Sequence, residues 1–325
     1  MAVTIDEISA VTEKLYLPLI ADNVMNSNPL MARFWQRGPK LRGGLGIHTP
    51  LMYQKVGSAG AIRGFEPMTI DADDQLTAVV FDWKEYYAAI VLSKRETLQN
   101  AGEAEMLSHI SAKSQMAEMT LRDLMGTGLY SDGTLLAGRA IDGLEAVMSL
   151  TNTYPNSGGA SVGIDRTVET WWQAKNIATW TLTYTGGGPL STTTAFLGAQ
   201  RMVGRCTEQP NSPTMILTTQ IGFDTFFSAY EDNQRFEDSG MASLGFETIL
   251  FRRIPIVVDS HIVAGRMYFL NENFLQLITH QDENFRFAPF REPINQKAMV
   301  GFIFWTGNLV CNDPRFQGVV LNFAA

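Results

Sequence analysis

Residues 76–92 read LTAVVFDWKEYYAAIVL, and this stretch decides the fold of the chain. Apolar and aromatic residues alternate along it with small or polar ones, which is the pattern of a β-strand. At ~3.3 Å per residue the strand would reach about 50 Å. On one face lie Val79, Phe81 and Trp83, and the alternation continues through Tyr87, Ala89 and Val91.

The strand is the return arm of a long β-ribbon, residues 51–92, whose outgoing arm begins near Leu51–Val56. Between the arms lie Gly57–Gly60, Pro67 and the acidic run Asp71–Asp74. An isolated two-stranded ribbon is at best marginally stable in water, so this one must dock on something. No adjacent segment offers a matching apolar strand, which makes a neighbouring copy of the chain the natural partner. Two ordinary strands of a compact sheet are the alternative, and the pattern favours that alternative at least as much.

The composition indicates a globular protein with few charges. The chain has 325 residues, of which 45% are hydrophobic and 18% charged, enough for one large or two medium domains. Its net charge of −8 gives no overall basic field of the kind that tight nucleic-acid binders use to displace counterions. The low charged fraction leaves more uncharged surface than a typical soluble monomer carries.

Nothing in the sequence points to secretion or to a membrane. Cys206 and Cys311 cannot build a disulfide framework, and buried thiols in a reduced compartment are the simplest interpretation. The N-terminus lacks the layout of a signal peptide, and the longest apolar run, Ala298–Trp305, is too short to span a bilayer. We therefore expect a soluble protein, made in a cytoplasm, with no membrane partner.

One long helix dominates the predicted elements of the first half. A short amphipathic helix is predicted over residues 4–16, and an irregular arm rich in helix breakers over residues 21–50. After the ribbon, Ala104–Met125 predicts a helix about 30 Å long. Its apolar stripe consists of Leu107, Ile110, Ser114, Ala117, Leu121 and Leu124.

The rest of the chain mixes helices with strands, so the predicted fold class is α+β. Helices are predicted at Val168–Ile177, Ser191–Cys206 and Ile221–Tyr230, and a short strand or turn at Ile141–Val147. The predicted strands are Thr179–Tyr184, Pro213–Thr219, Thr248–Phe251, Ile254–Val258, Met267–Leu270, Leu275–Thr279, Ala298–Trp305 and Val319–Phe323.

No sequence motif indicates a metal site, a nucleotide-binding site or a catalytic site. The histidines are His48, His109, His261 and His280. None has metal-ligand spacing, so we expect no metal site and no cofactor. Nucleotide-binding and nucleophile-elbow motifs are missing. Asp259-Ser260-His261 contains triad residue types, but in a strand Ser260 would point away from both neighbours. We expect no catalytic residues and a structural role.

The order of the predicted elements, together with several short segments, is recognisable. The segments are Asp82–Ala88, Ile141–Leu144, Gly163–Arg166 followed by Trp171-Trp172, Pro255–Asp259, Gly265–Asn271 and Trp305–Leu309. In this order they resemble the major capsid protein of tailed bacteriophages, the Hong Kong 97 phage-type capsid fold. The resemblance covers nearly the whole chain, and the number and order of the segments carry it.

The resemblance implies a domain map. Residues 1–47 would be the N-terminal arm and residues 48–98 the extended loop, a β-ribbon that lies across the adjacent subunit. Residues 99–189 and 283–325 would form the peripheral domain, with its spine helix at 103–126. Residues 190–282 would form the axial domain.

The resemblance also implies a function. The chain would be a major head protein that self-assembles into pentamers and hexamers of an icosahedral virion capsid. The shell would enclose double-stranded DNA without sequence-specific binding and would assemble in the host bacterial cytoplasm. Its partners would be other copies of itself, a portal and decoration proteins. Because there is no room for a scaffolding segment ahead of the arm, the resemblance implies a separate scaffolding protein or a route without one. The expected assembly residues of the extended loop and spine helix are Lys55, Phe81, Trp83, Tyr87, Leu107, Ile110 and Leu121.

Three other functions stay open from the sequence. The first is an encapsulin-like cellular compartment, which would use the same fold. The second is a cytoplasmic hydrolase built on the α/β region, with Asp259 or His261 near a cleft. The third is a tail or baseplate protein, which would form rings or tubes instead of closed shells.

Overall fold

The computed structural model describes residues 20, 24, 28–54, 57–68, 76–95, 103–155, 163–177, 192–208, 210–230, 248–294 and 296–321. Side chains are described for all of these except residues 103–109, 177, 192–196, 229–230 and 248. Three predictions lie outside the described residues: the helix over residues 4–16, the strand Thr179–Tyr184, and the role of Lys55.

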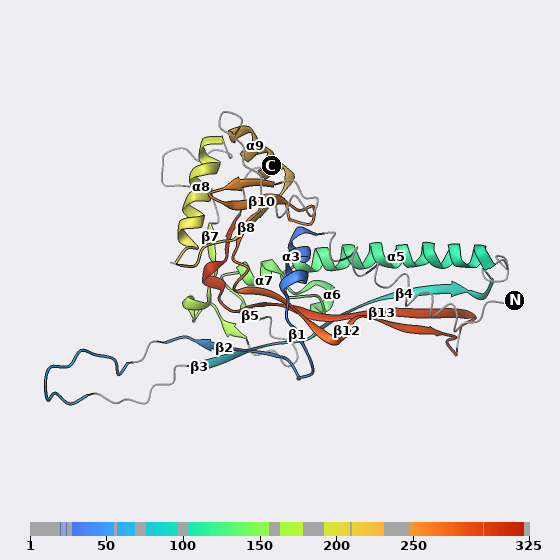
Figure 1. Cartoon of the computed structure of the whole chain (residues 1–325), viewed down its shortest axis with the longest axis horizontal. Helices are drawn as coiled ribbons and strands as arrows, with labels where there is room; N and C mark the ends of the chain where they lie inside the picture. The colour runs from blue at the N-terminus through green and yellow to red at the C-terminus, as the bar shows by residue number, and fades with distance from the viewer. Residues whose placement is uncertain are drawn as a thin grey trace.

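The return arm of the predicted ribbon forms two strands with different partners. β3 (Leu76–Phe81) pairs antiparallel with β2 (Ile47–Met52), from Ile47 opposite Phe81 to Met52 opposite Leu76. This pair forms a two-stranded sheet whose loop end projects from the molecule (Figure 1). β4 (Lys84–Ser93) continues instead into a larger sheet. The prediction of one unbroken arm was therefore wrong at Asp82 and Trp83.

The larger sheet supplies the strand partner that the sequence analysis did not find. It has four strands in the order β1-β12-β13-β4, with β1 at Lys40–Leu41, β12 at Leu275–Arg291 and β13 at Ala298–Cys311. β13 pairs antiparallel with the whole of β4, from Ala298 opposite Ser93 to Gly307 opposite Lys84. The cover for β4 thus comes from the C-terminal part of the same chain.

The long helix α5 (Glu103–Leu129) runs along this sheet (Figure 1). Its 27 residues correspond to ~40 Å, longer than predicted because Gly126 and Gly128 do not end it. Both glycines allow a close approach. A Cβ at Gly126 would lie 2.6 Å from Nε2 of His261, and one at Gly128 would lie 2.5 Å from the Tyr86 hydroxyl.

A second sheet, which we call the axial sheet, has helices of its own and a second apolar cluster on one side. Its strand order is β7-β14-β11-β8-β10-β9, and α8 and α9 pack against one another and against it. The bounds are β7 Lys175–Ile177, α8 Thr192–Arg205, β8 Met215–Thr218, α9 Gln220–Tyr230, β9 Thr248–Phe251, β10 Ile254–Val258, β11 Met267–Leu270 and β14 Gly318–Val320. β7 and β14 join this sheet from segments that the domain map had given to the peripheral domain.

Short elements correct three further predictions. The irregular arm contains a helix, α3 (Pro29–Arg37), because Asn28 Oδ1 caps it by accepting from the Leu30 and Met31 amides. Ile141–Val147 contains a helix rather than a strand, and Val168–Ile177 contains a 3₁₀ turn followed by β7. The remaining elements are α6 Leu135–Gly138, α7 Leu144–Met148, β5 Thr153–Tyr154, β6 Ile164–Asp165, η2 Thr170–Trp172 and η3 Pro314–Phe316.

Buried apolar side chains form two clusters. The main cluster joins the sheet of β4 and β13 to α5 and to the base of the β2–β3 ribbon, and contains Cys311. The second lies between the six-stranded sheet and its helices, and contains Cys206. Both cysteines are free and buried, as the sequence analysis expected. Among the described helices none has the length and apolar character needed to cross a bilayer.

Candidate assembly surfaces

The β2–β3 ribbon carries an exposed apolar surface, which we call the ribbon surface. Phe65 is 108% exposed, Met52 81% and Met68 69%. An apolar surface of this kind on a projecting element marks an interaction site. The members of the ribbon surface are Met52, Tyr53, Ile62, Phe65, Met68 and Leu76.

The base of the ribbon, in contrast, is anchored to the body of the chain. The Phe81 ring packs edge-on against Tyr154, with 5.5 Å between ring centroids, and at the loop end of β2 the half-exposed Tyr53 stacks on Trp171 at 6.0 Å. The Trp83 indole nitrogen donates to the Gly44 carbonyl over 3.1 Å. These contacts fix the position of the ribbon relative to the rest of the subunit, while its loop end stays exposed.

A buried polar cluster holds the junction between the ribbon and β4. Lys84 Nζ donates to the Gly138 carbonyl at 2.8 Å and lies 3.9 Å from Oδ1 of Asp142. Asn308 Nδ2 donates both to Asp142 Oδ2 and to the Asp82 carbonyl, each at 2.9 Å. Burial raises the pKa of Asp142, while the Lys84 ammonium and the Asn308 amide act in the opposite direction. The cluster therefore ties the end of the ribbon to β13.

A groove between β4 and α5 provides a second candidate surface. It encloses about 310 Å³ beside β4, the outer strand of its sheet. Tyr87 is 65% exposed at this groove and Met116 64%, and Lys113 adds a positive charge. Apolar side chains beside an outer strand offer a surface on which an extended segment can lie.

The predicted assembly residues divide between surface and core. Tyr87 is exposed, and Trp83 is half-buried. Phe81, Ile110 and Leu121 are each at most 1% exposed and pack inside the subunit, and their role in assembly stays a prediction. Ile110 and Leu121 are buried because they belong to the apolar stripe with which α5 covers β4. Lys55 lies outside the described residues, and for Leu107 only the backbone is described.

The sequence analysis predicted that the ribbon docks on a partner, but none of the assembly residues it named belongs to the ribbon surface. Ile62 and Phe65 lie in a segment that was interpreted only as a glycine-rich, acidic turn. Large apolar residues inside a predicted turn were the available signal, since such residues are normally buried unless they bind a partner.

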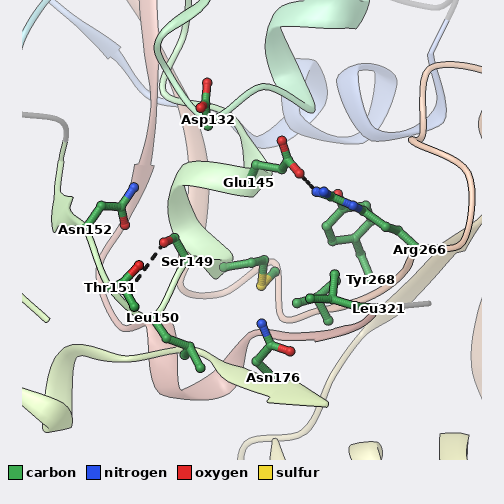
Figure 2. Close-up of a pocket in the computed structure, with 12 residues that line it drawn as sticks. Asp132, Glu145, Ser149, Leu150, Thr151, Asn152, Asn176, Arg266, Tyr268 and Leu321 are labelled. Carbon is green, nitrogen blue, oxygen red and sulfur yellow. Dashed lines mark hydrogen bonds and ion pairs between the residues drawn. The ribbon is translucent and has the colours of Figure 1, made fainter. Parts of the chain in front are cut away.

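An open pocket of about 470 Å³ lies between α7 and the axial sheet (Figure 2). Glu145 and Arg266 form an ion pair at one end, and the Thr151 amide donates to Ser149 Oγ. Apolar side chains of Met148, Leu150 and Leu321 complete the wall. The residues that line it include no histidine or cysteine that could act as a base or nucleophile.

The residues of the alternative hydrolase prediction are engaged in contacts within the chain. Asp259 is 4% exposed, accepts from the Tyr130 hydroxyl at 2.6 Å, and lies 3.2 Å from Nδ1 of His261. Both oxygens of its carboxylate therefore have partners. Among the described residues no group of three or more histidine, cysteine or acidic side chains is arranged to hold a metal ion.

Comparison with known proteins identifies the fold through structure alone. No protein-family model matches the chain, and no curated protein matches it. The capsid asymmetric unit of cyanophage A-1(L) aligns with a TM-score of 0.62 and 18% identity, covering 93% of this chain and 94% of that one. The capsid of the native GTA particle aligns at 0.58 and 10% identity, covering 90% of both chains.

The holo-SrpI encapsulin complex from Synechococcus elongatus also aligns, at a TM-score of 0.51 and 10% identity over 90% of this chain and 87% of that one. At these identities the likeness establishes the fold. The chain has the fold of tailed-phage major capsid proteins, the Hong Kong 97 phage-type fold, and the predicted α+β class is confirmed.

Proposed function

We propose that this chain is the major head protein of a tailed bacteriophage, which assembles into pentamers and hexamers of an icosahedral shell around double-stranded DNA. The observation that carries the proposal is the ribbon surface: an apolar, projecting ribbon with an anchored base has no use in an isolated subunit. The similarity to phage capsid proteins over nearly the full length supports it.

In the shell, the ribbon of one subunit lies across its neighbour. The β4–α5 groove is the receiving surface we propose, because it offers apolar side chains and Lys113 to a ribbon whose loop is acidic in sequence. Apolar burial gives ~25 cal/mol per Å², so a ribbon of this length can supply a substantial part of the contact energy. In this assignment residues 1–47 form the N-terminal arm, 48–98 the extended loop, 99–189 and 283–325 the peripheral domain, and 190–282 the axial domain.

The charge of the chain fits a lining for packaged DNA. Basic surfaces bind phosphates with a salt-dependent affinity. Because the chain has a net charge of −8, we expect little such binding, so that DNA can move along the inner wall of the shell. A scaffolding protein, a portal and decoration proteins are the further partners that the proposal expects. Assembly would take place in the host bacterial cytoplasm, and the proposal assigns no catalytic activity to the chain.

A cellular cargo compartment is the second candidate, and the similarity to the SrpI encapsulin favours it specifically. The two candidates share their subunit contacts, so they differ in what the particle contains. Nuclease-resistant double-stranded DNA in particles from the source culture would support the phage head. A protein cargo without DNA would support the compartment.

Electron microscopy of the expressed chain tests the proposal. We expect closed shells, and sedimentation at micromolar concentration should show pentamers, hexamers or shells. Rings or tubes would favour a tail protein. A folded monomer that forms no larger species at any salt or crowding condition would contradict the proposal.

A further inference from the structure

One histidine lies where the six-stranded sheet meets the long helix α5, beside apolar residues of both that belong to the main cluster. His261 follows β10, and its imidazole faces α5 at Gly126, where the helix backbone carries no side chain. β10 contributes Ile256 to the second apolar cluster and Val257 to the main one. The ring therefore lies at the contact between these two parts of the fold, the axial sheet and α5.

The imidazole lies between carboxylates from both parts. Its Nδ1 is 3.2 Å from Oδ1 of Asp259, which belongs to the axial side, and its Nε2 is 3.8 Å from Oδ1 of Asp123 on α5. The other charged group that faces it is Arg122, also on α5. The ring is 20% exposed, so it exchanges protons with solvent, and two carboxylates oppose one guanidinium around it.

The Asp259 carboxylate is also held by groups other than the imidazole, among them the His261 backbone amide. The Tyr130 hydroxyl, immediately beyond the end of α5, donates to Asp259 Oδ2 at 2.6 Å. Burial raises the pKa of Tyr130 well above its ordinary value, so the hydroxyl keeps its proton and this bond does not switch. Only the contact that runs through the imidazole can respond to pH in the neutral range.

We propose that Asp259, His261 and Asp123 form a pH-responsive latch, which holds the axial sheet to the long helix while His261 is protonated and loosens when it is neutral. A protonated ring donates from both nitrogens and can bridge the two carboxylates. A neutral ring has one donor, keeps its bond to Asp259 and has no charge to attract Asp123. The latch is a property of the folded chain, whatever assembly the chain forms.

The direction of the pH effect follows from the surroundings of the ring. The hydrogen bond to Asp259 is the largest influence and raises the pKa of His261, with both carboxylates acting in the same direction against burial and Arg122. A raised folded-state pKa adds stability below the unfolded-state value of ~6.5, which is lost as the pH rises through the folded-state value. The latch is therefore closed in mild acid and open in mild alkali.

Hydrogen exchange of the full chain, measured by mass spectrometry across this pH range and corrected for intrinsic rates, tests the latch. Protection of amides in residues 123–131 and 259–263 should fall as the pH rises. The fall should be missing in His261→Gln, and it should also be missing in Asp123→Asn, which removes the carboxylate on α5 that the protonated ring attracts. His48→Gln, at an exposed position on β2, is the matched control and should behave like the wild type.

Two results would overturn the latch. The first is amide protection in the wild type that does not change with pH. The second is a fall of protection in His261→Gln as large as the fall in the wild type. If His261→Gln does not fold, Asp123→Asn alone tests the latch. This variant should fold, because Asp123 is 80% exposed and its replacement leaves the core intact. A fall in Asp123→Asn as large as that of the wild type then contradicts the latch. None of these outcomes depends on shell formation, so the proposed function is tested separately.

Discussion

β3 and β4 are formed by consecutive segments with the same alternating pattern, yet they have opposite surroundings. β3 belongs to a two-stranded ribbon, and its outer end is open to solvent, with Leu76 67% exposed. β4 is paired with β13 along its full length and buries alternate residues beneath α5. The comparison teaches that the pattern defines a strand, while a distant partner decides whether the subunit or a neighbour covers it.

The largest expected effect comes from removing the cover of β4. Trp305 on β13 is fully buried and packs against Tyr86 of β4, with ring centroids 5.8 Å apart. Trp305→Ala should lower the free energy of unfolding by about 3–5 kcal/mol, because a large cavity would open in the core. Urea-induced unfolding measures the change. Phe65→Ala on the exposed ribbon is the matched control and should change it by less than ~0.5 kcal/mol. An equal loss of unfolding free energy in Trp305→Ala and Phe65→Ala would contradict the view that the subunit depends on the cover of β4 and not on the ribbon.

The polar cluster at the junction should give the next largest effect, and one that depends on pH. Lys84→Met leaves the buried Asp142 carboxylate without its cation and should cost about 3 kcal/mol at neutral pH. The pKa of Asp142 is already raised in the folded chain, and loss of the Lys84 ammonium should raise it further. The penalty should therefore grow as the pH rises through the folded-state pKa of Asp142 and shrink in acid, where the carboxyl is protonated in both proteins.

Urea unfolding of Lys84→Met at pH 4 and pH 7 makes this measurement. The double variant Lys84→Met/Asp142→Asn should recover most of the loss, since no buried charge then remains. A penalty that is the same at both pH values would show that Lys84 acts through packing alone.

The smallest effect concerns the loop end of β2, where the ribbon contacts the body of the chain. Trp171→Ala removes the ring on which Tyr53 stacks and should cost about 1 kcal/mol. The ribbon should then exchange its amides faster over residues 47–53 while β4 stays protected. Val168→Ala, at a position 72% exposed, is the control and should leave both strands unchanged. Loss of protection in β4 as well would mean that the ribbon and the sheet open as one unit.

Much of the fold could be predicted where the signal is local. The helices α5, α8 and α9 and the strands β9, β10 and β11 were found because their periodicity lies within their own residues. The helix α3 was missed because Asn28-Pro29, a capping residue followed by a proline in the first turn, was interpreted as a break.

The pairing of β4 with β13 could not be predicted, because the two segments are far apart in the chain and share no register signal. The candidate site was predicted in position but only partly in its residues. Alternation could not show that Asp82 and Trp83 interrupt the strand, after which Tyr86 faces the core and Tyr87 faces solvent. The sequence showed that Ile110 and Leu121 belong to an apolar stripe. Whether such a stripe packs on a sheet of its own subunit or on a neighbouring subunit depends on the tertiary structure.

The most direct test of the central claim, that the ribbon builds an assembly and not the subunit, is electron microscopy of a variant in which a short Gly-Ser turn replaces residues 58–75. We predict that the wild-type chain forms closed shells. The variant should keep its circular dichroism and its unfolding free energy, because β4 and β13 are intact, but should form no shells. A variant that closes into shells as stable as those of the wild type would contradict the account.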